Sequence, residues 1–301
     1  MSSELVTESL ETTGQSQLGD DLTDLYISFG GTETPNEKTL LDFAGSTLDF
    51  RAGRPREDTP WSDGGSLTPS QKQATLDVAT RWGMLQTTEP HNPYDQLVIL
   101  GAHRDSLTLR TRHAVELAQQ RRDGIANFIV LSCFRPIHPK EGIDQTEIDN
   151  EQELAVSLLQ DNIGAKFETE TVSSWDDQPD DTERATGEYG IAYMGKIGLH
   201  HATIISGSVP SSNVRATTVS TLESLRTHLE DSRPRLLFVT TSLHLPYQAI
   251  QVKRVMQGFE SEVAGIAYDW LAKLTIESED ADFRVVLQEI GATIKNSLAN
   301  T

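Results

Sequence analysis

The sequence predicts an α/β protein built on a doubly wound, mainly parallel sheet with helices on both faces. Short apolar runs bounded by turn formers recur along the chain, and segments with helical spacing of apolar residues lie between them. The apolar runs do not alternate polar with apolar residues, which is typical of strands covered on both faces. Right-handed crossovers between such strands then give a Rossmann-like three-layer sandwich.

The predicted strands are short runs of apolar residues without a polar, solvent-facing side. They are Leu97–Gly101, Ala126–Ser132, Ala202–Ser206, Leu236–Thr241 and Val263–Tyr268. Because a strand without a polar face needs cover on both sides, we expect Leu97–Gly101 and Leu236–Thr241 in the interior of the sheet.

The predicted helices carry apolar residues three and four positions apart. They are Leu107–Arg121, Glu151–Leu159, Glu188–Ile197, Thr218–Leu229, Pro246–Phe259 and Ala281–Ala299, preceded by Thr68–Leu85, which is expected to cap the sheet. A capping box formed by Ser220 and Glu223 is the expected start signal of one of them.

The formal charge of −20 is concentrated in two segments of the 301-residue chain. Residues 1–70 hold 13 acidic and 4 basic groups, and residues 141–190 hold 15 and 2. We expect residues 1–20 to be a disordered acidic tail, residues 21–92 an N-terminal extension with a helix near 68–85, and residues 93–299 the α/β domain. Residues 51–70 are predicted to be a linker or surface loop, and residues 173–187 an acidic excursion from the domain.

Composition excludes several function classes. The acid excess argues against proteins that bind nucleic acid or an anionic membrane by neutralising phosphates. The single cysteine, Cys133, excludes an intrachain disulfide and argues against a cysteine-based zinc site. The N-terminus lacks the pattern of a secretory or transit peptide, and no apolar run approaches the roughly 20 residues of a membrane span. We therefore expect a cytoplasmic protein that contacts neither nucleic acid nor membrane.

Small and polar residues follow the predicted strands, where open α/β sheets bind ligands. The candidate ligand-binding residues are Gly101, Arg104, Arg110, Ser132, Arg135, Thr241 and Ser242. The arginines would pair with an anion, and the hydroxyls would orient it. His244 is the candidate catalytic residue, because a histidine is the commonest general acid or base. The alternative is that His244 only caps the helix that follows.

The sequence gives little support for other catalytic or metal-binding sites. The chain has no G-x-G-x-x-G, no P-loop and no G-x-S-x-G elbow. Cys133 is a second candidate nucleophile, with simple burial as the alternative. The adjacent His200 and His201 precede a predicted strand and are interpreted as a solvated turn, so no metal site is expected.

Three segments resemble successive motifs of the domain of unknown function 218 family, whose members include SanA, YdcF and ElyC. They are LVILGAHRDSLTLRTRHAVEL (97–117), IVLSCFRP (129–136) and LLFVTTSLHLPYQAIQVKRVM (236–256). The residues that match the family pattern are Gly101, Arg110 with Ala114, Ser132, Thr241, Ser242 and His244. The resemblance covers roughly residues 95–299 and is most specific at Thr241–Tyr247.

The chain departs from this pattern at three places. Tyr247 stands where the family has arginine, Cys133-Phe134 replaces two glycines, and residues 217–220 replace a Thr-x-Glu-Asn helix start. The family's acidic residue matches Glu151, Glu153 or Glu188, and the motifs do not choose among them.

The resemblance implies a nucleotide-like or phosphate-bearing small-molecule ligand, with S-adenosylmethionine as the candidate cofactor. Two functions follow. One is a small-molecule enzyme or ligand-binding protein with His244 and Arg110 near one pocket. The other is a non-catalytic relative that uses its acidic segments to engage a basic protein partner.

Overall fold

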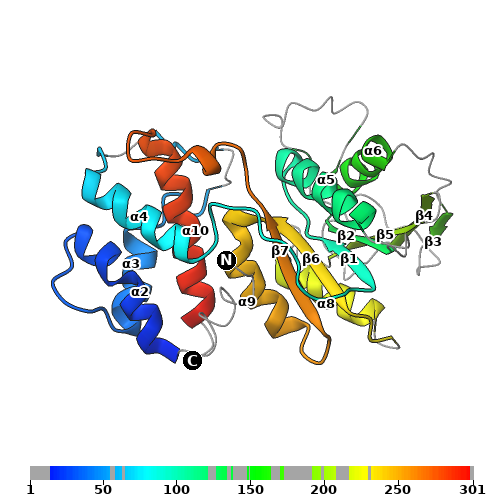
Figure 1. Cartoon of the computed structure of the whole chain (residues 1–301), viewed down its shortest axis with the longest axis horizontal. Coiled ribbons are helices and arrows are strands. Elements are labelled where there is room, and N and C mark those ends of the chain that lie inside the picture. Colours follow the sequence, from blue (N-terminus) through cyan, green and yellow to red (C-terminus); the bar gives the residue numbers. More distant parts are fainter. Residues whose placement is uncertain are drawn as a thin grey trace. The chain divides into compact units, whose positions relative to one another are not determined.

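The computed structural model describes residues 14–54, 58–62, 65–120, 127–133, 137, 148, 150–163, 170–172, 192–197, 200–207, 217–229 and 232–298. The chain divides into two compact units, drawn in Figure 1. The sheet unit comprises Pro90–Thr240 and Gln251–Ile266. The helical unit comprises Met1–Glu89, Thr241–Ile250 and Ala267–Thr301.

One sheet in the order β3-β4-β5-β2-β1-β6-β7 contains the strands of the described residues. The strands are β1 (Gln96–Ile99), β2 (Asn127–Ser132), β3 (Glu170–Val172), β4 (Ala192–Ile197), β5 (His200–Ser206), β6 (Leu236–Thr241) and β7 (Ser261–Ile266). Strands β5, β2, β1, β6 and β7 run parallel. Both β1 and β6 have a strand on either side, which confirms that they lie in the interior of the sheet.

The parallel strands are buried on both faces, which explains their continuous apolar sequence. Leu97 and Ile99 of β1 belong to the core shared with α5 (Arg104–Gln120) and α6 (Glu151–Ile163). Val98 points to the opposite face and is fully buried too. Figure 1 shows α5 and α6 on one side of the sheet and α8 (Thr218–His228) on the other. The sheet unit is therefore the predicted three-layer, Rossmann-like α/β sandwich.

The structure corrects one element and two local predictions in the sheet unit. Residues 192–197 form β4, antiparallel to β5, where the spacing of apolar residues predicts a helix over Glu188–Ile197. Pairing with β5 satisfies the backbone of this segment, and such long-range pairing overrides local periodicity. His200 and His201 open β5 and do not form a turn.

The capping box of α8 lies three residues before its predicted position. The Thr217 side chain accepts a hydrogen bond from the Ser220 N–H, and Ser220 Oγ accepts one from the Thr217 N–H. Ser220 thus takes the third helical position and Thr217 the cap, so the predicted Ser220–Glu223 pairing is wrong.

The helical unit has its own core. Its helices are α2 (Gly14–Ser28), α3 (Glu37–Ser46), α4 (Pro69–Arg81) and α10 (Asp280–Leu298), with short 3₁₀ turns η3 (Ser242–His244) and η4 (Leu271–Lys273). Helix α9 (Leu245–Val255) spans the boundary between the two units. The largest buried side chains of this core include Trp82 and Phe283.

Helix α2 is the first element of the described residues. It includes residues 14–20, whereas residues 1–13 lie outside the described residues, so the disordered tail over residues 1–20 stays a prediction. Leu22 and Leu25, three residues apart on α2, are fully buried in the helical core. This burial stabilises a helix that its polar composition alone does not predict.

Helix α4 packs in the helical core against α2 and α10. The expectation that it caps the sheet stays a prediction. It begins with a capping box between Thr68 and Gln71, with Pro69 in the first turn. It ends at Arg81, before the predicted Leu85, because Gly83 has a φ of +68°, which a continuing helix does not allow.

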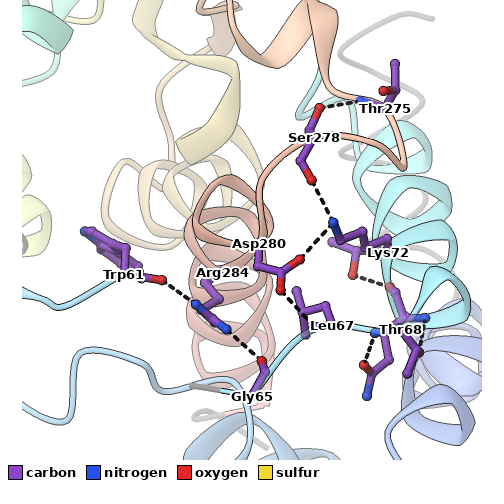
Figure 2. A network of polar contacts seen from close by, with 11 residues as sticks. Trp61, Gly65, Leu67, Thr68, Lys72, Thr275, Ser278, Asp280 and Arg284 are labelled. Carbon is purple, nitrogen blue, oxygen red and sulfur yellow. Dashed lines mark hydrogen bonds and ion pairs between the residues drawn. The ribbon is translucent and has the colours of Figure 1, made fainter. Parts of the chain in front are cut away.

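Polar contacts fasten the predicted linker to α4 and α10 (Figure 2). Asp280 pairs with Lys72 at 2.8 Å and accepts a hydrogen bond from the Leu67 N–H. The Lys72 bond, with the Leu67 N–H, holds the pKa of the Asp280 carboxyl below its usual range. Arg284 donates to the carbonyls of Trp61 and Gly65. The described part of residues 51–70 before α4 is irregular as predicted, but its backbone is held in place.

The division into units differs from the predicted domain boundaries. The C-terminal helix α10 packs against α3 and α4 in the helical unit, whereas the sequence places it in an α/β domain over 93–299. Gly291 allows this packing, since an added Cβ there would lie 3.0 Å from Leu48 Cβ. The acidic excursion predicted at 173–187 lies outside the described residues.

Candidate functional site

Gly101 follows β1 at the carboxyl edge of the sheet, where the backbone passes very close to its neighbours. A Cβ at this position would lie well inside 3.0 Å of the Leu131 carbonyl oxygen and 2.8 Å from Glu151 Oε1. Only glycine leaves room for this approach. The small residue that the sequence places at the end of β1 is therefore needed to bring β1, β2 and α6 together.

Arg110 is 1% exposed on α5 and supports the same turn. Its Nη1 donates to the Leu100 carbonyl at 2.7 Å and to the Gly101 carbonyl at 2.9 Å. These contacts give the guanidinium a structural role in holding the turn after β1. Its expected role in binding an anion stays a prediction.

A buried polar cluster lies at the carboxyl ends of β2 and β5. Ser132 and Ser206 are register partners on these strands and are fully buried. Ser206 Oγ donates to Gln152 Oε1 at 3.0 Å. Among the described residues, neither Ser132 Oγ nor Gln152 Nε2 has a hydrogen-bond partner. A buried polar atom without a partner is costly, so these two atoms are suited to receive a polar ligand or a water molecule.

Of the two candidate carboxylates that the structure describes, only Glu151 lies inside this edge. Glu151 is 3% exposed and accepts a hydrogen bond from the Cys133 thiol at 3.3 Å. Glu153 is exposed, and Glu188 lies outside the described residues. Cys133 is itself buried, which fits the simple-burial interpretation of this residue.

The structure adds little about the other two candidate arginines, Arg104 and Arg135. Arg104 is exposed in the first turn of α5. Arg135 lies outside the described residues. The sequence therefore places Gly101, Ser132 and Arg110 at one edge of the sheet unit, but it does not point to Gln152, which the start of α6 brings there.

At the end of β6, three residues of the helical unit form a polar chain. His244 Nδ1 lies 2.5 Å from Thr241 Oγ1, and His244 Nε2 lies 3.7 Å from Glu289 Oε1. His244 and Glu289 are each 7% exposed, and Thr241 is fully buried. The imidazole is thus held between a hydroxyl and a carboxylate in a site with little water, where polar contacts are strong.

Glu289 is a residue that sequence reasoning missed. It lies on α10 among the buried Val286, Leu287 and Ile290. An acid in such an apolar stretch is the signal that could have revealed it, because buried carboxylates need a partner.

Two neighbours of His244 have other roles. Ser242 Oγ donates to the Met84 carbonyl at 2.7 Å, which ties η3 to the residues after α4. The ring of Tyr247 contacts that of His244 edge-on, with centroids 5.9 Å apart. Tyr247 thus places an uncharged ring beside the imidazole.

The predicted site residues fall into both units. Gly101, Arg110 and Ser132 belong to the sheet unit, whereas Thr241, Ser242 and His244 belong to the helical unit. The expected approach of Arg110 to His244 stays a prediction.

Comparison with protein-family models, with curated proteins and with solved structures gives no match. In the described part of the chain, no group of three or more metal-ligating side chains gathers in one place. No helix of that part is long and apolar enough to cross a lipid bilayer.

Proposed function

We propose that the chain binds a nucleotide-like or phosphate-bearing small molecule at the carboxyl ends of its strands, and that His244 moves a proton to or from it. The observation that carries the proposal is the chain of contacts from Thr241 through His244 to Glu289. A histidine with a hydroxyl on one nitrogen and a carboxylate near the other is the arrangement that proton transfer requires.

Each member of this chain has a distinct role in the proposal. The Glu289 carboxylate is a positioning group, which orients the ring and stabilises the imidazolium. His244 Nδ1 accepts the proton of the Thr241 hydroxyl or, when the ring is protonated, donates a hydrogen bond. The alternative interpretation of His244 as a helix cap has less support, because the imidazole nitrogens face Thr241 and Glu289.

The sheet unit has buried polar groups of its own that suit a ligand. Ser132 Oγ and Gln152 Nε2 are buried donors without partners among the described residues. Their position after β2 and at the start of α6 is where open α/β sheets bind ligands. The family resemblance favours a phosphate-bearing compound and makes S-adenosylmethionine the first candidate to test. A cytoplasmic location is part of the same proposal.

A ligand screen by thermal shift tests the proposal. The full chain is heated with nucleotides, sugar phosphates and S-adenosylmethionine, and a ligand at one hundred times its dissociation constant adds about 2.7 kcal/mol of stability. We expect His244→Gln to weaken the ligand by at least tenfold. His228→Gln, an exposed histidine on α8, is the matched control and should leave affinity unchanged.

A second variant separates positioning from folding. Glu289→Gln keeps the size of the side chain, and it should lower the apparent pKa of His244 in an NMR titration because the carboxylate is lost. Equal ligand affinity in the wild type, His244→Gln and Glu289→Gln would refute the proposed role of this chain of contacts.

A further inference from the structure

A small pocket opens on the sheet unit, away from the strand ends described above. It is lined by Arg226, Thr227, Arg233, Gln257 and Phe259 and has a volume of about 230 Å³. These residues come from the last turn of α8, the segment before β6 and the segment between α9 and β7. Because Arg233 precedes β6 and Phe259 precedes β7, the pocket lies at the amino ends of the strands.

Both arginines are held in place by backbone carbonyls at the end of α9. Arg226 Nη1 donates to the Val255 carbonyl at 3.0 Å, and Arg233 Nη1 donates to the Gly258 carbonyl at 3.1 Å. The Arg233 guanidinium also lies over the Phe259 ring, 5.9 Å from its centroid. These contacts reduce the conformational entropy that each side chain would lose on binding a ligand.

Gly258 fits the guanidinium of Arg233 closely. Its φ of +89° lies in the left-handed region, as at many helix ends. An added Cβ would lie 3.0 Å from Arg233 Nη1. The glycine lies in the turn after α9, which ends at Val255, and leaves space for the cation that lines the pocket.

No carboxylate of the described residues lies within ion-pair distance of Arg226 or Arg233, although the chain carries 45 acidic residues. Arg235, two residues from Arg233, does have a carboxylate partner, because its Nη2 lies 2.7 Å from Asp95 Oδ1. Each pocket guanidinium has five N–H donors and uses one on a backbone carbonyl. Among the described residues, two positive charges without a carboxylate in ion-pair distance therefore line one pocket.

We propose that this pocket binds a phosphate group, either as inorganic phosphate or as the phosphate of a small ester. Guanidinium forks match phosphate oxygens in geometry and charge, and two of them balance a dianion. The Gln257 amide adds a neutral donor, whereas Thr227 directs its hydroxyl hydrogen to the Glu223 carbonyl. The volume is below the roughly 300–1,000 Å³ of pockets for drug-sized ligands, which favours a small anion.

This site is independent of the proposed function. The ligand of the amino-end pocket does not reach the carboxyl ends of the same strands, so it acts as an effector or a docking group and not as the reacting molecule. Variants of His244 and of the two arginines should affect different binding events.

Titration of inorganic phosphate into the full chain tests the proposal, with amide NMR shifts as the readout and ionic strength held constant. We expect saturable shifts at Thr227, Gln257 and Phe259. Arg226→Gln and Arg233→Gln should each weaken phosphate by about tenfold. Arg254→Gln removes the same charge from α9 outside the pocket and should change the affinity less than twofold.

Two further arms complete the experiment. Arg233→Lys keeps the positive charge but loses the planar fork of the guanidinium, so it should also weaken phosphate binding. It replaces the glutamine variant as the test if that variant fails to fold. Ribose 5-phosphate distinguishes the sources: tighter binding than inorganic phosphate indicates an ester, and equal or weaker binding indicates the free ion. Unsaturable shifts, complete displacement by chloride at equal concentration, or an equal loss in Arg254→Gln would overturn the proposal, whereas His244→Gln should leave this binding intact.

Discussion

Replacing Gly101 with alanine tests the close approach at the carboxyl edge of the sheet. The new Cβ would lie within 3.0 Å of the Leu131 carbonyl and 2.8 Å from the Glu151 carboxylate, distances that real Cβ atoms essentially never show. Glu151 has a flexible end and can move away. Leu131 cannot move alone, because it is a backbone group of β2 and is paired in register with Ile205 of β5.

The expected loss of stability follows from two opposing effects. Overpacking a tight site destabilises the folded state by about 1–3 kcal/mol. Alanine also lowers the conformational entropy of the unfolded chain, which stabilises the protein by about 0.4–1 kcal/mol. We therefore expect Gly101→Ala to destabilise the protein by about 1–2 kcal/mol. At roughly 2–4 °C per kcal/mol, the midpoint of thermal unfolding should fall by several degrees.

Gly45→Ala is the matched control. Gly45 lies within α3, where an added Cβ meets nothing within 4 Å, so alanine should stabilise by about 0.5–1 kcal/mol through its helix propensity. Thermal and urea unfolding followed by far-ultraviolet circular dichroism measure both variants. A Gly101→Ala midpoint at or above that of the wild type would show that the edge relaxes freely and that glycine is not required there.

Four other substitutions give three separate tests. Arg110→Met removes two charge-assisted bonds to carbonyls and should cost about 2–4 kcal/mol in urea unfolding; a loss below 0.5 kcal/mol together with weaker ligand binding would instead make Arg110 an anion ligand. Ser132→Ala should change stability by less than 0.5 kcal/mol, whereas Ser206→Ala should cost about 1 kcal/mol because it breaks the bond to Gln152; equal effects in differential scanning calorimetry would contradict this. The lowered pKa of Asp280 contributes stability above the usual carboxyl pKa, and this stability is lost as pH falls through the folded-state pKa; Asp280→Asn should remove that part of the acid dependence between about pH 5 and 2 in urea midpoints, and an unchanged profile would refute it.

The parallel strands could be predicted from sequence because their signal is local. Leu97–Ile99 and Leu236–Val239 are apolar at every position, and burial of both faces requires this whichever strands become their neighbours. The polar residues that end these strands could be predicted as well, since the carboxyl edge follows from chain direction. Gly101, Ser132 and Thr241 lie at the ends of the strands for this reason.

The companions of these residues depend on long-range contacts. Gln152 and Glu151 come from the start of α6, and Glu289 comes from α10, far away in the chain. No spacing in the sequence links them to Ser206, Cys133 or His244. Their roles appear only when the backbone brings the segments together.

The sequence by itself determined the α/β class, the five parallel strands and the positions where polar groups follow them. The reason is that apolar runs and helical spacing are patterns of residues close together in the chain. Tertiary structure decided that residues 192–197 form a strand, that α10 joins the N-terminal helices, and that Glu151 rather than Glu153 is buried at the edge. Each of these outcomes depends on hydrogen bonds or buried area shared between distant segments. The free energy of these contacts depends on both segments, so the apolar periodicity of one segment does not predict it.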